Sequence, residues 1–157
     1  MRAFTYVCPL LEYCSPVWSP SSKTLIDQLE SVQQRFTKRL PGLQSITYDE
    51  RCACLKIDRL ELHRLYADLI LCYKIIHGLT VLPSEKFFTI TAKHVTRGHS
   101  FKMFLPESRV NCRHFFVVRV VKVWNSLPAD VVCANSASVF VHKLKSVDFS
   151  QFLIGKD

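Results

Sequence analysis

RLELHRLYADLILCYKIIH, residues 59–77, is the clearest predicted helix of the chain. Asp58 and Glu61 have the spacing of a capping box at its start, and Gly78 stands where a glycine commonly ends a helix. Its apolar side chains recur at helical spacing, which predicts one face in a core. The predicted face comprises Leu62, Leu65, Tyr66, Leu69, Cys72, Tyr73 and Ile76. The tyrosines are interpreted as core residues rather than as a stacking platform.

Upstream, the pattern predicts two more helices. Ser22 is the predicted cap of the first, which ends before Pro41-Gly42. Its expected apolar face comprises Leu25, Leu29, Val32, Phe36 and Leu40. Residues 47–50, Thr-Tyr-Asp-Glu, have capping-box spacing and predict a short helix through Leu55. A short helix is also expected at residues 9–13, followed by an irregular turn rich in serine and proline.

Downstream of residue 79 the pattern changes. Extended pieces on either side of Gly98 predict one small hairpin within residues 88–105. Residues 113–127 are rich in valine, which favours a strand, but their apolar positions fit the helical period better, so we expect a helix that ends before Pro128. A last helix is predicted from Ser136 through Lys145.

The predicted fold class is therefore mainly α, with helical bundle-like segments and one small β-hairpin. The chain of 157 residues is long enough to bury a core. We expect a helical segment at 1–80, a basic segment with the hairpin and two helices at 81–148, and a frayed tail at 149–157.

Positive charge is concentrated in one part of the chain. The net charge is +8, and residues 86–122 hold eight cations against the single anion Glu107. Lysine and arginine neutralise phosphates, and the phenylalanines between them could stack on unpaired bases. The alternative, an ordinary phenylalanine core under a solvated face, stays open. The residues predicted to contact nucleic acid are Lys93, Arg97, Lys102, Arg109, Arg113, Arg119 and Lys122.

Motifs for catalysis are not found in the sequence. There is no Asp-Asp pair for two magnesium ions, no phosphate-binding glycine loop and no nucleophile motif. We therefore expect no enzyme activity and no cofactor in this chain. The seven cysteines form no regular framework, which favours free thiols in a reducing compartment. A zinc site formed by His94, His99, Cys112 and His114 remains an alternative.

The cellular location is predicted from the length and interruption of the apolar runs. They are shorter than a membrane-spanning helix, and the amino-terminal run is interrupted by Pro9 and Glu12. We expect an intracellular protein, nuclear or cytoplasmic, that is not secreted and has no membrane partner.

An ordered set of motifs carries a family resemblance. Residues 119–128, RVVKVWNSLP, resemble the end of the region that follows the polymerase core in non-LTR retrotransposon reverse transcriptases of the LINE type, jockey-like branch. Four further stretches of this chain resemble motifs of the same family. They are TYVCPLLEYCSPVWSP (5–20), LESVQQRFTKRLPGL (29–43), YDERCACLKIDRLELHRLYADLILCYKIIHGL (48–79) and TRGHSFKMF (96–104). The resemblance covers about residues 4–148, with Cys8 in place of the family's usual arginine.

The resemblance implies part of an RNA-directed DNA polymerase. It implies thumb-like and post-thumb helices that hold a template–primer of RNA and DNA, and a truncated copy that lacks the polymerase core. The catalytic aspartates and their magnesium would belong to the absent palm, so no catalytic residue is carried over. A helical protein-interaction module, or a decayed fragment without function, is the alternative.

Overall fold

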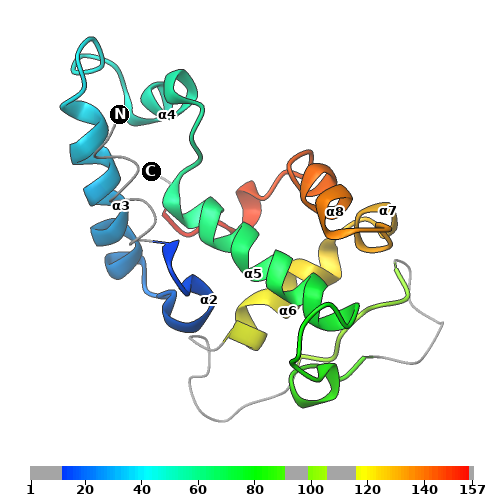
Figure 1. Ribbon diagram of the computed structural model, residues 1–157. Helices are drawn as coiled ribbons and strands as arrows, with labels where there is room; N and C mark the ends of the chain where they lie inside the picture. Colours follow the sequence, from blue (N-terminus) through cyan, green and yellow to red (C-terminus); the bar gives the residue numbers. More distant parts are fainter. Residues whose placement is uncertain (1–11, 91–98, 106–115, 156–157) are drawn as a thin grey trace.

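A central helix, α5, organises the computed structural model, which describes residues 12–90, 99–105 and 116–155. This helix, Leu60–Ile76, crosses the middle of the molecule (Figure 1). It contacts α2 (Ser15–Trp18) and α3 (Lys23–Lys38) on one side, and α6 (Phe116–Ser126) and α8 (Ala137–Leu144) on the other. The mainly α prediction is confirmed.

The start of α5 differs from the prediction. Arg59, not Asp58, is the N-cap residue, and its side chain makes no capping bond. Instead, Glu30 of α3 accepts hydrogen bonds from the backbone N–H groups of Leu60, at 3.1 Å, and Glu61, at 3.3 Å. A carboxylate distant in sequence thus satisfies donors that every helix leaves open in its first turn.

The end of α5 follows the prediction. Gly78 has a φ of +65°, the left-handed conformation that glycine adopts without strain. The Gly78 N–H donates to Ile75 O at 3.2 Å, and the Leu79 N–H donates to Lys74 O at 2.8 Å. These two bonds form a Schellman motif, which ends the helix at the expected glycine.

Helix α3 was predicted correctly in extent, but its buried face was not. Ile26, Glu30, Gln33 and Thr37 are buried, whereas Leu25 of the expected apolar face is 48% exposed. The polar side chains can be buried because they are hydrogen-bonded across the interface. Gln33 donates to Asp58 O at 3.0 Å, and Thr37 accepts from Arg51 at 3.1 Å. Arg51 belongs to α4, Tyr48–Leu55, whose predicted capping box between Thr47 and Glu50 is confirmed.

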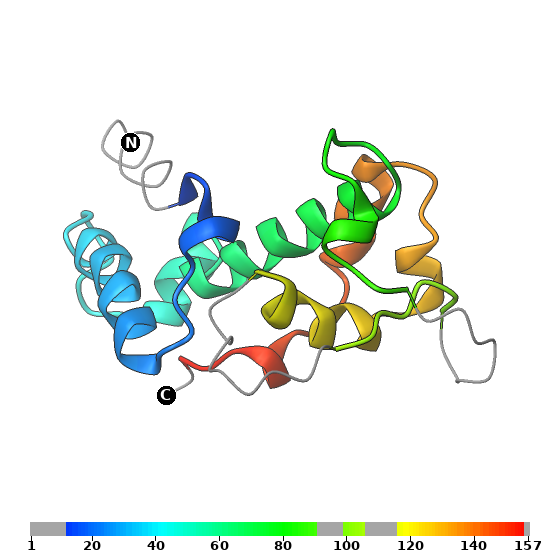
Figure 2. The same ribbon diagram turned by 90° about the horizontal axis from the view of Figure 1, so that it is seen from below.

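The apolar core lies between α5, α6 and α8. Figure 2 shows α6 running beneath α5, with α8 at the far end of both helices. The rings of Tyr73 and Phe140 stack at 4.4 Å between centroids, and Trp124 lies 6.0 Å from Phe140. The predicted 113–127 helix is observed as α6, and a short α7, Ala129–Val132, links it to α8. The core therefore joins residues from both predicted segments, 1–80 and 81–148.

The structure does not support the predicted hairpin at 88–105, whose middle, residues 91–98, lies outside the described residues. Within the described ranges no strand forms, and one antiparallel bridge between Ile90 and Met103 remains. The Phe104 N–H still donates to Thr89 O at 2.9 Å, but α6 takes other hydrogen bonds of this backbone. Asn125 bonds both the N–H and the C=O of Met103, at 2.9 and 2.8 Å, and the Trp124 indole N–H donates to Phe101 O at 2.9 Å.

The carboxyl-terminal residues expected to be frayed are held through Gly155. One short 3-10 helix, Ser84–Lys86, lies between α5 and α6. A second, Ser150–Phe152, follows α8, and after it the chain returns to α5. Phe149 is buried, and Glu61 accepts hydrogen bonds from the N–H groups of Ile154, at 2.7 Å, and Gly155, at 3.0 Å. Of the helices in the described part of the chain, none combines the length and apolar character needed to cross a membrane.

Candidate nucleic-acid interface

The structure places three of the seven cations predicted to contact nucleic acid. Lys102, Arg119 and Lys122 are described, and Lys93, Arg97, Arg109 and Arg113 lie outside the described residues. The three placed cations come from two elements, the 99–105 segment and α6, which the Trp124 and Asn125 hydrogen bonds hold together.

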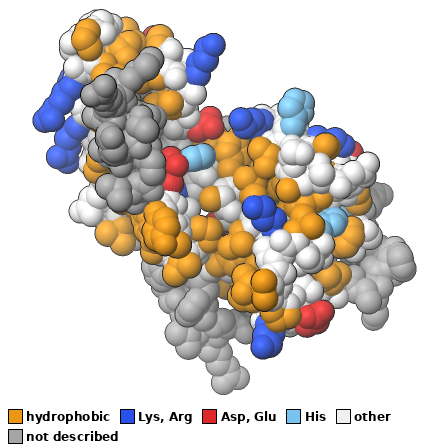
Figure 3. Space-filling view, viewed as in Figure 1, with side chains coloured by type: hydrophobic (Ala, Val, Ile, Leu, Met, Phe, Trp, Pro, Cys, Tyr) orange, Lys and Arg blue, Asp and Glu red, His pale blue; other side chains and the backbone are white. Residues whose placement is uncertain are grey.

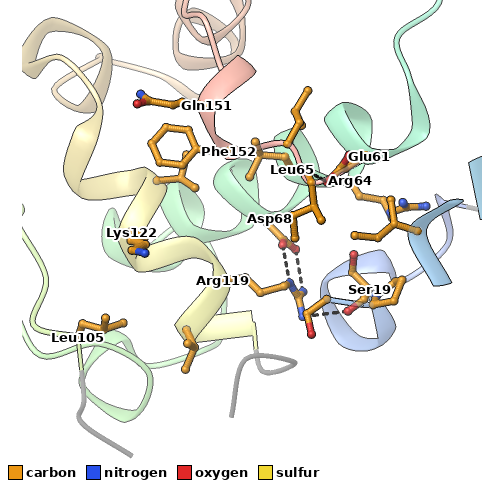
Figure 4. A pocket seen from close by; sticks show the side chains of 17 residues that line it. Ser19, Glu61, Arg64, Leu65, Asp68, Leu105, Arg119, Lys122, Gln151 and Phe152 are labelled. Atoms are coloured by element: carbon orange, nitrogen blue, oxygen red, sulfur yellow. Dashed lines mark hydrogen bonds and ion pairs between the residues drawn. The ribbon is translucent and has the colours of Figure 1, made fainter. Parts of the chain in front are cut away.

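Arg119 lies largely inside the molecule. Its guanidinium donates to both carboxylate oxygens of Asp68, at 3.1 and 3.3 Å, and to the carbonyl oxygen of Ser19, at 3.3 Å (Figure 4). It also donates to the carbonyl oxygen of Pro16, at 2.9 Å. Burial raises the pKa of Asp68, and the hydrogen bond from Arg119 opposes that rise. Arg119 therefore connects α6 with α5, with α2 and with the residue that follows α2, and few donors are left for an external phosphate.

Lys122 and Lys102 remain more accessible. Lys122 lies one turn after Arg119 on α6 and is exposed, beside a cavity that both side chains line. Lys102 is half-buried in the segment attached to Trp124 and Asn125. The exposed Lys122 ammonium group can neutralise a phosphate from solvent.

Most of the phenylalanines between the cations belong to the core. Phe88 is buried, and Phe87, Phe101 and Phe116 are partly buried against the core cluster. Phe115 lies outside the described residues, and Phe104 is 59% exposed. Among the described members of this group, Phe104 is the one that could stack on a base. The interpretation of Tyr66 and Tyr73 as core residues is confirmed, since Tyr73 is buried and Tyr66 packs edge-on against Phe149.

A second group of cations lies at the end of α3, away from the predicted basic segment. Arg35, Lys38 and Arg39 are all exposed there. On the face seen in Figure 3, Lys and Arg side chains gather along the outer edge of α3 and are otherwise scattered among apolar side chains. The sequence signal was the Lys38-Arg39 pair, which is equally explained by the favourable position of cations at a helix carboxyl end.

The described residues form no candidate metal site, and two of their cysteines are buried. No group of three metal-ligating side chains occurs in the described ranges. Of the zinc alternative, His94, Cys112 and His114 lie outside those ranges, and His99 is buried with Nε2 at 3.1 Å from Trp124 O. Burial raises the pKa of the Cys52 and Cys72 thiols, which keeps them protonated and unreactive.

Comparisons with models of protein families, with curated proteins and with solved structures found no match for this chain.

Proposed function

We propose that the chain is a C-terminal part of a non-LTR retrotransposon reverse transcriptase that contacts template–primer nucleic acid and does not polymerise by itself. The observation that carries the proposal is the ordered set of family-like motifs, which ends in Trp124-Asn-Ser-Leu-Pro128. The helical fold is consistent with a thumb-like role. The net charge of +8 favours a polyanionic partner.

The test is binding to a fluorescently labelled RNA–DNA hybrid, measured by anisotropy over a series of salt concentrations. The variant changes Lys102 and Lys122 to glutamine, which removes two accessible charges and leaves the Arg119–Asp68 pair intact. We expect weaker binding and a slope of log K against log salt that is smaller by about 2, because each phosphate contact contributes about 0.9. A second variant changes Lys93, Arg97, Arg109 and Arg113 to glutamine.

The matched control changes Lys74 and Lys145, exposed cations on α5 and after α8, to glutamine. It removes the same net charge as the Lys102 and Lys122 variant from other parts of the surface, so it corrects for the general loss of attraction. The second variant removes twice as much charge and is therefore compared with the control per charge removed. The nucleic-acid proposal is abandoned if neither variant loses more affinity per charge than this control, or if wild-type protein does not bind at about 50 mM salt.

A helical protein-interaction module is the second candidate, favoured by exposed apolar side chains on α2 and α3. Val17 is 83% exposed, and Trp18, Leu25 and Val32 are also exposed. Such a patch marks an interaction surface in many proteins, and the partner would be the polymerase core of the parent protein. Changing Val17 and Leu25 to serine should then abolish association with that core and leave hybrid binding unchanged. If the variant still associates with that core but binds the hybrid more weakly, the result argues for the nucleic-acid role.

A further inference from the structure

A cavity of about 570 Å³ lies between α5, α6 and the carboxyl-terminal segment. Figure 4 shows Arg64 and Asp68 of α5, Arg119 and Lys122 of α6, and Phe152 arranged around it. Its size falls within the range of small-molecule sites in proteins. Its walls combine apolar side chains with a few charged groups, as ligand sites do. The apolar part of the lining includes Leu65, Val118, Val123, Phe152 and Leu153.

Arg64 is the unusual residue of this cavity. Its side chain is buried, and both terminal guanidinium nitrogens lack a hydrogen-bond acceptor among the described residues. In Figure 4 the guanidinium points away from the Asp68–Arg119 pair. Burial lowers the pKa of Arg64, but an arginine remains charged in a protein. A buried charge without a partner destabilises a fold, so its presence requires an explanation.

The carboxylates around Arg64 are bonded to other groups. Glu30 accepts from the Tyr48 hydroxyl as well as from the first turn of α5. Glu61 accepts from the carboxyl-terminal backbone, and Asp68 accepts from Arg119. Across the cavity, Lys122 is exposed and forms no ion pair within the described ranges. The lining thus has more cationic capacity than its own carboxylates use.

We propose that this cavity binds a small organic anion, with its charged head between Arg64 and Lys122 and its apolar body against Leu65 and Phe152. The head is a phosphate or a carboxylate, because both accept several hydrogen bonds from a guanidinium. The Arg64 nitrogens are closed to solvent in this conformation, so the side chain must rotate toward the cavity on binding. The proposal is independent of nucleic-acid binding.

Phenyl phosphate and benzoate are suitable probes for the two head groups, each titrated by calorimetry into the full chain at low salt. Inorganic phosphate is the charged head of phenyl phosphate alone, acetate stands for the carboxylate head of benzoate, and phenol stands for the aromatic body of both. We expect at least one probe to bind at least tenfold more tightly than either half. The stronger of the two identifies the head group that the cavity prefers.

Arg64→Met separates binding from stability. Methionine keeps an apolar stem of similar length and removes the unpartnered charge, so the thermal midpoint should be unchanged or higher while probe binding falls at least tenfold. Lys122→Met, at an exposed position, should weaken binding severalfold without affecting folding. Lys74→Met, on the exposed face of α5, is the matched control and should bind like wild type.

Three results would each overturn the proposal. The first is that neither probe binds at millimolar concentration. The second is that Arg64→Met binds like wild type. The third is that Arg64→Met unfolds at a lower temperature or fails to fold, because the guanidinium would then be serving the structure rather than a ligand.

Discussion

At the scale of single residues, Asn125 connects α6 to a segment that has little regular structure. Its side chain bonds the N–H and the C=O of Met103, whose own side chain is buried. Asn125→Ala should lower the free energy of unfolding by about 2 kcal/mol, since two backbone groups lose their partners. Urea denaturation followed by circular dichroism measures the change.

Asn135 provides the matched control for Asn125. It is exposed, so Asn135→Ala should change the free energy of unfolding by less than about 0.5 kcal/mol. If Asn125→Ala had an equally small effect, its hydrogen bonds to Met103 would not contribute to stability.

His99 gives the fold a dependence on pH. Its Nε2 lies 3.1 Å from Trp124 O, and its buried Nδ1 has no hydrogen-bond partner among the described residues. Burial lowers the pKa of His99, and the nearby charge of Lys102 lowers it further, whereas the bond to Trp124 opposes the shift. The unfolded chain therefore binds a proton at His99 near pH 6.5, before the folded chain does.

The stability from neutral His99 is fully present above pH 6.5 and decreases as the pH falls toward the lowered folded pKa. The free energy of unfolding is measured at about pH 8 and about pH 5, and its decrease between the two should be smaller for His99→Gln than for wild type. His142→Gln, at an exposed position on α8, should keep the wild-type loss. Equal losses in wild type and His99→Gln would contradict the assignment.

At the scale of elements, periodicity predicted where helices occur better than which face they bury. For α3 the extent was right, yet Glu30, Gln33 and Thr37 occupy the interface in place of the apolar stripe. Their partners lie 14 to 31 residues away along the chain, in α4 and at the start of α5. A pattern of apolar spacing contains no information about such pairs, so a buried polar face could not be predicted from it.

Glu30 is the residue through which α3 stabilises α5. Its carboxylate accepts the Tyr48 hydroxyl at 2.6 Å and two N–H groups of the first α5 turn. Glu30→Gln places an NH2 donor where an acceptor is needed, so we expect a loss of about 1–3 kcal/mol in unfolding free energy. Thermal or urea denaturation measures it.

Glu85→Gln makes the same chemical change at an exposed position in the 3-10 helix Ser84–Lys86. It should leave the free energy of unfolding within about 0.5 kcal/mol of wild type. A loss as large as that of Glu30→Gln would mean that removal of a negative charge, rather than of the α5 cap, destabilises this basic chain.

At the scale of the whole molecule, we expect α5 to make the described chain one cooperative unit. It contacts α2 and α3 as well as α6 and α8, so neither side keeps its interface when α5 unfolds. The two tryptophans report on the two sides, because Trp18 ends α2 and Trp124 is a buried residue of α6. In urea, the variants Trp18→Phe and Trp124→Phe, each with one remaining tryptophan, should show fluorescence transitions that coincide with loss of helix in the same variant.

Separate transitions for fluorescence and circular dichroism would mean that the α2–α3 side unfolds independently. Binding of a hydrophobic dye before the transition would point the same way, because it reports exposed apolar surface. The test compares two probes within each variant, so a general loss of stability from either substitution does not affect it.

The candidate site was only partly predictable, because its contacts join residues that are far apart in the sequence. The count of cations in 86–122 located a basic segment but could not show that Arg119 pairs with Asp68, 51 residues earlier. Nor could it show that Arg64 finds no acceptor in the part of the chain that the structure describes. Those facts depend on how α5 and α6 pack. The helix was correctly expected to end before Pro128, while the bonds of Trp124 and Asn125 to the 99–105 segment required the fold to be known.

The bonds from Trp124 and Asn125 have a consequence for hydrogen exchange. The Met103 amide proton is held by a side-chain oxygen of α6, rather than by a neighbouring strand. Its exchange with solvent therefore requires the end of α6 to release Asn125, and the Phe101 carbonyl is held by the same turn through the Trp124 indole. A segment without regular secondary structure thus acquires the protection against exchange of the helix that binds it.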